Sequence, residues 1–579
     1  MGLIWLRHPV LWHSSRVAGG YNYNAMTAEE RKLLVARWHN WYTADWDYAQ
    51  TTVIFFCTAI FVAAVLNKLA WLHGRNLMHV ARNRPGFGDK LTAAMRYATA
   101  RQFYLGLTRW YTPPLAAVVG VCGMSIFILA LMFSARPFYW PNEQMGHSPP
   151  LATRSGWIAI AIMPFMIAFA TKINFIGLVT ETSHEKLQVF HRWSALFMYI
   201  ASLVHTFPFI INNVALGIME SQYAKSPWYW SGIAALIPQT YLILMSWGIF
   251  RNQYYETFKK LHFIASGIFM AALFIHVNFR LTSWDYFWAT LALYGLAWLT
   301  RVVRTLYTTG FGLPSTIESV GPNLVKISIP IQGRFSWAAG QHVFIRVLGL
   351  GVHALTSHPF TISSIAEKDK VVELVLRARG GLTQALQQRV AGKASWSSRI
   401  VLDGPYGGLH APLPLERYER VVFLSGGTGT TFTLPIFRDL LPKLTEESVL
   451  KRISFVVAVP DADNYAWMGP HLAAATASHG DTVDIRVHFT RSGDADIPSK
   501  DDESDIHNAN PEGVAYGRPI LGDIIREAHA SASRVAIVAC GPDGFLYDVR
   551  NSVAGCELDI ADGFGVCRDL FLHTETYSW

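Results

Sequence analysis

The chain has 579 residues, which is too long for a single hydrophobic core and requires several domains. Hydrophobic residues make up 51% of it and charged residues only 16%, a balance that indicates a membrane protein. The net charge of +8 is better explained by basic membrane-flanking loops than by nucleic-acid binding. Five cysteines in so long a chain do not make a disulfide framework.

Seven stretches in the first part of the chain are long and apolar enough to cross a hydrocarbon core of about 30 Å. They lie near Thr52–Trp71, Pro114–Phe133, Trp157–Phe175, Gln188–Ile210, Gly232–Phe250, His262–Phe279 and Tyr286–Thr300. This pattern predicts an all-α membrane bundle of about seven transmembrane helices. The remainder, after about residue 305, has the composition of a water-soluble α/β protein.

The loop after the first of these stretches is strongly basic. Against Asp89 alone it carries Arg75, Arg82, Arg84, Lys90, Arg96, Arg101 and Arg109. Cytosolic loops show this excess of lysine and arginine. We therefore expect this loop and everything after about residue 305 in the cytosol, and the N-terminus on the other side.

Two of the apolar stretches contain a pair of histidines with the same spacing. His191 and His205 are 14 positions apart, and so are His262 and His276. At about 100° and 1.5 Å per residue, each pair faces one side of a helix and is separated by about 21 Å. Neutral imidazole binds haem iron well. One such pair would be ordinary core packing as readily as a ligand set, but two pairs inside membrane-length segments favour iron ligation.

The predicted orientation decides which histidines face one another. The two stretches are separated by one further span, so they run parallel. His191 then faces His262 near the cytosol, and His205 faces His276 near the outer side. Two irons at these levels would form a path for electrons across the bilayer.

From about residue 312 the pattern changes to short strands broken by glycine and proline, which predicts a small antiparallel barrel. The strands lie at Leu324–Ile329, His342–Val347, Val371–Ala378 and Arg399–Leu402. One motif in this region reads His358-Pro359-Phe360-Thr361-Ile362-Ser363-Ser364, whose hydroxyls can bond a flavin. A second, Arg377-Ala378-Arg379-Gly380-Gly381-Leu382-Thr383, sets a cation before a glycine turn and a helix start, where phosphate binds well. Asp403-Gly404-Pro405-Tyr406-Gly407 closes the predicted barrel.

A second nucleotide-binding pattern follows. Val421–Leu424 reads as a buried strand, and Ser425-Gly426-Gly427-Thr428-Gly429-Thr430-Thr431 leads from it into a helix that starts near Phe432. Strand, glycine turn and helix form a cradle for nucleotide phosphates. Another strand, Val535–Val538, ends in Ala539-Cys540-Gly541-Pro542-Asp543-Gly544. Ligands of parallel sheets bind at the carboxyl ends of the strands, so we expect Cys540 at that crevice.

Taken in order, these motifs resemble the fungal ferric and cupric reductases of the ferric reductase–NADPH oxidase superfamily. The resemblance covers roughly residues 110 to 579. It implies a ferredoxin-reductase-like cytosolic module with an FAD-binding β-barrel and an NADPH-binding α/β domain. We therefore expect an N-terminal extracytosolic segment (1–50), an extra transmembrane helix with the basic cytosolic loop (51–110), a di-haem membrane domain (111–305), an FAD domain (306–412) and an NADPH domain (413–579).

The resemblance also assigns residues to cofactors. It implies that His191 and His262 bind the inner b-type haem, and His205 and His276 the outer one. The expected flavin and dinucleotide residues are His358, Pro359, Phe360, Thr361, Ser364, Arg377, Gly381, Thr383, Gly426, Gly427, Thr428, Gly429, Thr430, Arg491, Arg518, Cys540, Gly541 and Pro542. Cys540 is expected beside the nicotinamide and Trp579 over the flavin ring, as the two catalytic positions. Either Arg491 or Arg518 could hold a 2′-phosphate, which favours NADPH over NADH.

The implied activity is electron transfer from cytosolic NADPH, through FAD and two haems, to a ferric or cupric chelate across the membrane. The resemblance also implies functional coupling to an iron permease or oxidase. The plasma membrane is the expected location, with a vacuolar or other internal membrane as the alternative. A superoxide-producing NADPH oxidase is the first rival function, and a transporter or channel with a regulatory nucleotide domain is the second.

Overall fold

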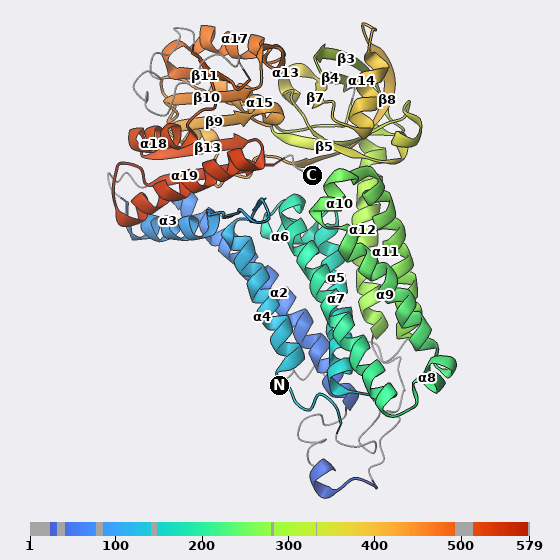
Figure 1. Cartoon of the computed structure of the whole chain (residues 1–579). Helices are drawn as coiled ribbons and strands as arrows, with labels where there is room; N and C mark the ends of the chain where they lie inside the picture. The colour runs from blue at the N-terminus through green and yellow to red at the C-terminus, as the bar shows by residue number, and fades with distance from the viewer. Residues whose placement is uncertain are drawn as a thin grey trace. The chain divides into compact units, whose positions relative to one another are not determined.

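The computed structural model describes residues 24–31, 41–76, 85–140, 148–278, 283–331, 333–491 and 513–576. The contacts divide the chain into two compact units. Unit 1 consists of Met1–Asn67 with Val119–Thr300, and unit 2 of Lys68–Val118 with Arg301–Trp579. Figure 1 shows that unit 1 is helical and that both large sheets belong to unit 2.

The long helices of the membrane half are α2, α4, α5, α7, α9, α11 and α12. Their bounds are Trp41–Asn76, Leu115–Phe133, Pro150–Ala170, His184–Ala215, Pro227–Met245, Tyr255–Val277 and Ser283–Thr309. Three short helices join them: α6 (Phe175–Thr180), α8 (Met219–Lys225) and α10 (Gly248–Gln253).

Five of the described helices are long and apolar enough to cross a membrane. They are Asp47–Leu72 within α2, then α4, α5, α7 and α11. The stretches expected to span near residues 232–250 and 286–300 also fold as helices, α9 and α12, but are not among these five. Both helices are rich in tryptophan and tyrosine, which lowers their mean hydropathy.

Helix α5 forms the centre of unit 1. Its side chains Ile158, Ile162 and Met163 are fully buried, and α5 packs along α7. The helix ends at Ala170, earlier than the expected Phe175. The reason is Asn174, whose Nδ2 donates to Ala168 O at 2.9 Å and whose Oδ1 accepts from the backbone of α6. A side chain that bonds both neighbouring helix ends stops one helix and starts the next.

The first sheet of unit 2 is antiparallel, with strand order β6-β5-β8-β3-β4-β7. The strands are β3 (Leu313–Gly321), β4 (Leu324–Pro330), β5 (Gln341–Val347), β6 (His358–Thr361), β7 (Val371–Arg377) and β8 (Trp396–Gly407). Just past β6, Ser363 N donates to Glu373 O of β7 at 2.8 Å. This bond joins the two edges of the sheet, so the expected barrel is present.

The second sheet is parallel, with strand order β12-β11-β10-β9-β13-β14. The strands are β9 (Arg420–Gly426), β10 (Arg452–Val459), β11 (Val483–Phe489), β12 (Val514–Tyr516), β13 (Arg534–Cys540) and β14 (Asp569–Glu575). Every residue of β9 is buried, as expected for a central strand with both faces covered. The chain order reverses between β9 and β13, which makes this the switch point of the sheet.

The remaining helices of unit 2 flank these sheets. They are α13 (Ala366–Asp369), α14 (Gly381–Val390), α15 (Thr430–Leu440), α16 (Ala462–Tyr465), α17 (Gly469–His479), α18 (Leu521–Ser531) and α19 (Asp543–Asp562). One further helix, α3 (Phe87–Ala100), comes from the basic loop near the N-terminus. It packs against α19, and Figure 1 shows the two helices side by side.

Candidate functional site

The four histidines lie on two helices of unit 1. Helix α7 carries His191 and His205, and helix α11 carries His262 and His276. Each pair is therefore on one unbroken helix. Since 14 residues rise about 21 Å along a helix, the rings occupy two well-separated levels.

Three of the four rings are oriented by backbone carbonyls at 2.8 Å. The Nδ1 atoms of His191, His205 and His276 bond to the carbonyl oxygens of Met166, Ala152 and Trp228 respectively. Because a carbonyl only accepts, Nδ1 must carry the proton in each ring. The other nitrogen, Nε2, then presents its lone pair, which is the tautomer that binds a metal.

One ring from each helix meets at the outer level. The centroids of His205 and His276 are 5.9 Å apart. His191 and His262 are close enough to interact electrostatically. A metal–imidazole bond is about 2 Å long, so two rings that share one iron stand about 6 Å apart between centroids. The residues present therefore fit a bis-histidine haem.

Two glycines make room for the outer pair of rings. A Cβ atom on Gly156 would lie 2.6 Å from Nδ1 of His205, and one on Gly232 would lie 3.0 Å from Cε1 of His276. Any side chain at Gly156 would have to displace the ring or its helix. The positions of these rings thus depend on the absence of a side chain on the neighbouring helix.

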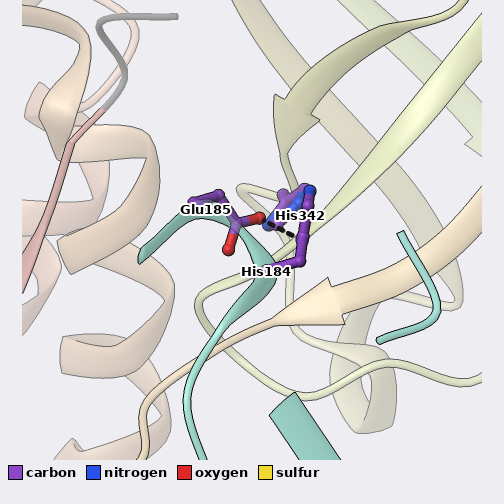
Figure 2. Close-up of side chains that lie close together, drawn as sticks. All are labelled: His184, Glu185 and His342. Carbon is purple, nitrogen blue, oxygen red and sulfur yellow. Dashed lines mark ion pairs between the residues drawn. The ribbon is translucent and has the colours of Figure 1, made fainter. Parts of the chain in front are cut away.

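A fifth histidine, His184, begins α7. Figure 2 shows it beside Glu185, with which it forms an ion pair of 2.8 Å between Nδ1 and Oε1. Both side chains are nearly buried. His184 is thus one residue of a local ion pair at the start of α7.

The first flavin motif forms β6 and the turn after it. His358 is buried beside Thr356, whose hydroxyl is 3.0 Å from His358 Nε2, and the side chains of residues 359–361 are partly exposed. Ser364, expected to contact the flavin, is fully buried and accepts a 3.1 Å bond from Glu373 N. Its hydroxyl therefore takes part in the hydrogen bonds of the barrel itself.

The second flavin motif connects β7 to α14. Arg377 ends the strand, and Gly381 begins the helix with a φ of +52°, a conformation that favours glycine. Thr383 Oγ1 accepts from Arg379 N at 3.1 Å, which caps the helix. The result is a cation beside the positive end of a helix, an arrangement that suits a pyrophosphate.

Asp403 at the end of the barrel is held by two arginines from the last turns of α12. Arg301 Nε and Arg304 Nη2 lie 2.6 and 3.2 Å from its carboxylate, and Tyr406 donates its hydroxyl to it at 2.6 Å. Burial and then the Asp403 charge raise the pKa of Tyr406, so its hydroxyl remains a donor. Nothing in the sequence alone indicated that these arginines bind Asp403.

The glycine loop and the cysteine motif meet at the switch point of the parallel sheet. Strands β9 and β13 are neighbours, with Ser425 opposite Cys540. A Cβ on Gly429 would overlap the Cys540 carbonyl, and one on Gly426 would lie 2.8 Å from Pro542. Only glycine permits this approach. Helix α15 starts directly after the loop, so its amide end faces the crevice.

The side chains around this loop are also fixed. Thr430 is fully buried, and its hydroxyl donates to Gly427 O at 3.0 Å, which stabilises the turn itself. Thr428 is half-buried. Burial raises the pKa of the Cys540 thiol well above its ordinary value, so the group is a neutral thiol at physiological pH.

Comparison with known proteins gives the same domains in the same order. The ferric reductase like transmembrane component matches residues 155–273. An FAD-binding domain matches residues 312–410, and the ferric reductase NAD binding domain matches residues 418–554. The chain thus carries, one after another, three domains that match those of ferric reductases.

Individual proteins similar to this chain come from fungi. A probable cell surface ferric reductase of Aspergillus oryzae is 31% identical over 64% of the chain and 51% of the relative. Ferric/cupric reductase transmembrane components 7 and 2 of Saccharomyces cerevisiae are 24% and 27% identical. They match 91% and 71% of the chain, and 93% and 59% of their own lengths. The chain thus spans about half of the Aspergillus relative and nearly all of yeast component 7.

The two arginines expected to hold the adenosine end of the dinucleotide lie in exposed loops of unit 2. Arg491 follows β11 and Arg518 follows β12. The pKa of Asp461 lies below its usual range because Asn464 bonds to it and because Arg491 and Arg377 stand nearby. Trp579, the expected flavin cover, lies outside the described residues.

One ion-pair contact of unit 2 joins residues outside the three matched family regions and was not expected from the sequence. Arg96 of α3 inserts between Glu557 of α19 and Asp569 of β14, at 3.4 and 2.7 Å. Gln102 extends the contact, because it accepts from Arg550 Nη1 at 2.9 Å. The only sequence signal was the run of basic residues between the first two spans. That run indicates the cytosolic side of the membrane, but it does not reveal that Arg96 forms an ion pair with the buried Asp569.

Proposed function

We propose that this chain transfers electrons from cytosolic NADPH, through FAD and two b-type haems, to a ferric or cupric chelate on the other side of the membrane. The bound cofactors supply the hydride and single-electron chemistry. The observation that carries the proposal is the placement of two histidines on α7 and two on α11, with the His205 and His276 rings 5.9 Å apart between centroids.

The chain's own residues have defined tasks in this proposal. The four histidines hold iron at two levels about 21 Å apart. The carbonyl partners of three of them fix the ring orientation, a second layer of contacts that such ligands commonly need. At the switch point, the Cys540 thiol is buried and neutral, so it would add no charge beside the nicotinamide.

The assembly of unit 2 supports the orientation that we propose. Its residues 68–118 lie between α2 and α4, and its residues from 301 onward continue α12. Because α3 packs on α19, the basic loop and the dinucleotide domain belong on one side of the membrane. The positive-inside rule makes that side the cytosol. We place the protein in the plasma membrane and propose coupling of the reduced metal to an iron permease or oxidase.

The direct test is anaerobic titration of the purified full-length protein with NADPH, followed by a ferric chelate and then by oxygen. We expect two b-type haems per chain, reduced by NADPH and reoxidised by the chelate. His205→Ala should leave one haem, still reducible by NADPH, and abolish chelate reduction. His184→Gln, on the same helix but outside the pairs, should retain both haems.

Three outcomes would count against the proposal. A protein with one haem or none would remove the electron path. Rapid superoxide formation with no chelate reduction would make the chain an oxidase instead. Absence of NADPH-dependent haem reduction in both the wild type and His205→Ala would favour a transporter with a regulatory nucleotide domain.

A further inference from the structure

Three possible metal ligands gather between α18 and α19, apart from the residues assigned to cofactors. His529 lies in the last turn of α18, and Cys556 and Asp559 lie three residues apart on α19. A spacing of three places two side chains on the same face of a helix. One ligand atom from each of the three residues lies within 4.8 Å of the other two.

The burial of this trio is unusual for polar groups. His529 is 7% exposed and Cys556 is 2% exposed, while Asp559 is at the surface. Nε2 of His529 is buried and makes no hydrogen bond among the described residues. A buried ring nitrogen normally finds a partner, so this atom points to a ligand that completes it.

A neutral His529 ring can donate a nitrogen lone pair to a metal. Burial lowers the pKa of His529 below its ordinary value, although Asp559 opposes the shift, so the imidazole is neutral at physiological pH. Burial raises the pKa of Cys556 to about 11, and Asp559 and Glu557 add to the rise while Arg526 opposes it. A metal must therefore displace the thiol proton, which makes its affinity increase with pH. Arg526 itself is paired with Asp523 at 2.5 Å.

Imidazole nitrogen, thiolate sulfur and carboxylate oxygen together suit Zn²⁺. Zinc binds all three donors at about 2.0–2.3 Å, whereas Ca²⁺ and Mg²⁺ take oxygen ligands. In a tetrahedral site with such bonds, the ligand atoms are about 3.5 Å apart. The ligand atoms now lie within 4.8 Å of one another, so side-chain movements of about 1 Å would bring them to that spacing. Because Asp559 is exposed, water can take the fourth position.

We propose that His529, Cys556 and Asp559 form a Zn²⁺ site with water as the fourth ligand. The ion would clamp α18 to α19 at the end of α19 remote from Cys540. It would thereby hold the helix that starts at the nicotinamide-side motif. The site lies at the periphery of unit 2 and contributes no group to the electron path.

The test uses the full-length protein in detergent. After removal of bound metal with a chelator, the protein is dialysed against buffered free Zn²⁺, and zinc is measured per flavin. We expect one zinc per chain. Its K-edge X-ray absorption, which the haem irons do not obscure, should show one sulfur at about 2.3 Å and nitrogen or oxygen at about 2.0 Å.

The variants separate this site from other thiols and imidazoles. Cys556→Ser and His529→Gln should each weaken zinc binding at least tenfold, and Asp559→Asn somewhat less. Two controls should bind like the wild type: Cys122→Ser in α4, and His479→Gln at the end of α17, whose Nδ1 is also buried without a described partner. Retained flavin, with haem reduction by NADPH, shows that a variant is folded.

The proposal is overturned by any of three results. These are a wild-type protein that takes up no zinc, a zinc spectrum without sulfur, or zinc binding that Cys556→Ser and His529→Gln leave unchanged. If Cys556→Ser fails to retain flavin, zinc binding by the Asp559→Asn and His529→Gln variants still tests the proposal. Asp559 is exposed, so its amide variant changes the ligand without emptying the core.

Discussion

The histidine region of unit 1 and the dinucleotide crevice of unit 2 are built on different principles. In unit 1 the chemistry is carried by side chains at fixed intervals on continuous helices, and carbonyls orient the rings. In unit 2 it is carried by backbone, because glycines bring one loop against the carbonyl of Cys540. A side-chain site can be recognised from spacing, whereas a backbone site depends on which strands are neighbours.

The largest expected effect concerns the backbone site. Gly429→Ala places a Cβ against the Cys540 carbonyl, which cannot rotate away. The loop must move by about 1 Å, and we expect NADPH-dependent flavin reduction to fall about 100-fold while haem content is unchanged. Stopped-flow reduction under anaerobic conditions measures this. Gly555→Ala, on α19 with open space around it, is the matched control, and equal rates in both variants would refute the close approach.

The next effect concerns the attachment of α3. Arg96→Ala leaves the Asp569 carboxylate buried without its cation and Glu557 without its hydrogen-bond donor, so we expect unit 2 to lose about 2 kcal/mol of stability. This loss is smaller than the roughly 3–5 kcal/mol typical of a fully buried ion pair, because the Arg96 side chain is 29% exposed to solvent. Thermal release of flavin fluorescence reports it. Lys90→Ala, on the same helix, should change little, and an unaltered transition in Arg96→Ala would show that α3 does not support the domain.

A smaller effect is expected in the side-chain site. Gly156→Ala puts a methyl group against the His205 ring, which can tilt together with its helix. We expect about a tenfold loss of outer-haem occupancy, or about 1.4 kcal/mol, with flavin reduction by NADPH intact. Haem spectra per flavin measure this. Gly123→Ala, which meets no atom within 4 Å, should keep both haems. A normal spectrum in Gly156→Ala would mean that the ring position is not set by that contact.

The last prediction concerns the pH dependence of stability. Burial raises the pKa of Glu557 from 4.5 to about 8, with Arg96 opposing the rise. The folded state then holds a proton that the unfolded state has released, so this contribution is complete below about pH 4.5 and is lost as the pH rises through 8. Glu557→Gln should flatten this decline in the stability of unit 2. Parallel pH profiles for the two proteins would contradict the assignment.

Much of this architecture was readable from the sequence, for a physical reason. Long apolar stretches must form helices in a bilayer, because their backbone has no other partners. The strands beside each motif were likewise expected, and β4, β5, β7, β9 and β13 fall where predicted. Strands β3 and β6 were not foreseen, since each is defined by pairing with a distant partner rather than by its own alternation.

Other features depended on contacts that no local pattern encodes. The stop at Ala170 requires Asn174 to bond both helix ends. Ser364 lies in a flavin motif, yet its hydroxyl is used by β7, which the motif alone could not reveal. The bond between Arg301 and Asp403 joins residues about 100 positions apart. The bonds of Arg96 to Glu557 and Asp569 join residues about 460 or more positions apart. In each case the deciding partner is remote in sequence, although every residue involved is ordinary in its own segment.

The packing of α3 on α19 has a practical consequence for anyone who wishes to study the soluble half alone. A fragment that begins near residue 301 would contain both sheets but would lack the arginine that bonds Glu557 and Asp569. Such a fragment would also lose the cover that α3 gives to α19. Supplying residues 86–114 as a separate peptide should restore this contact, so that the smallest stable form of the soluble half consists of two pieces of chain rather than one.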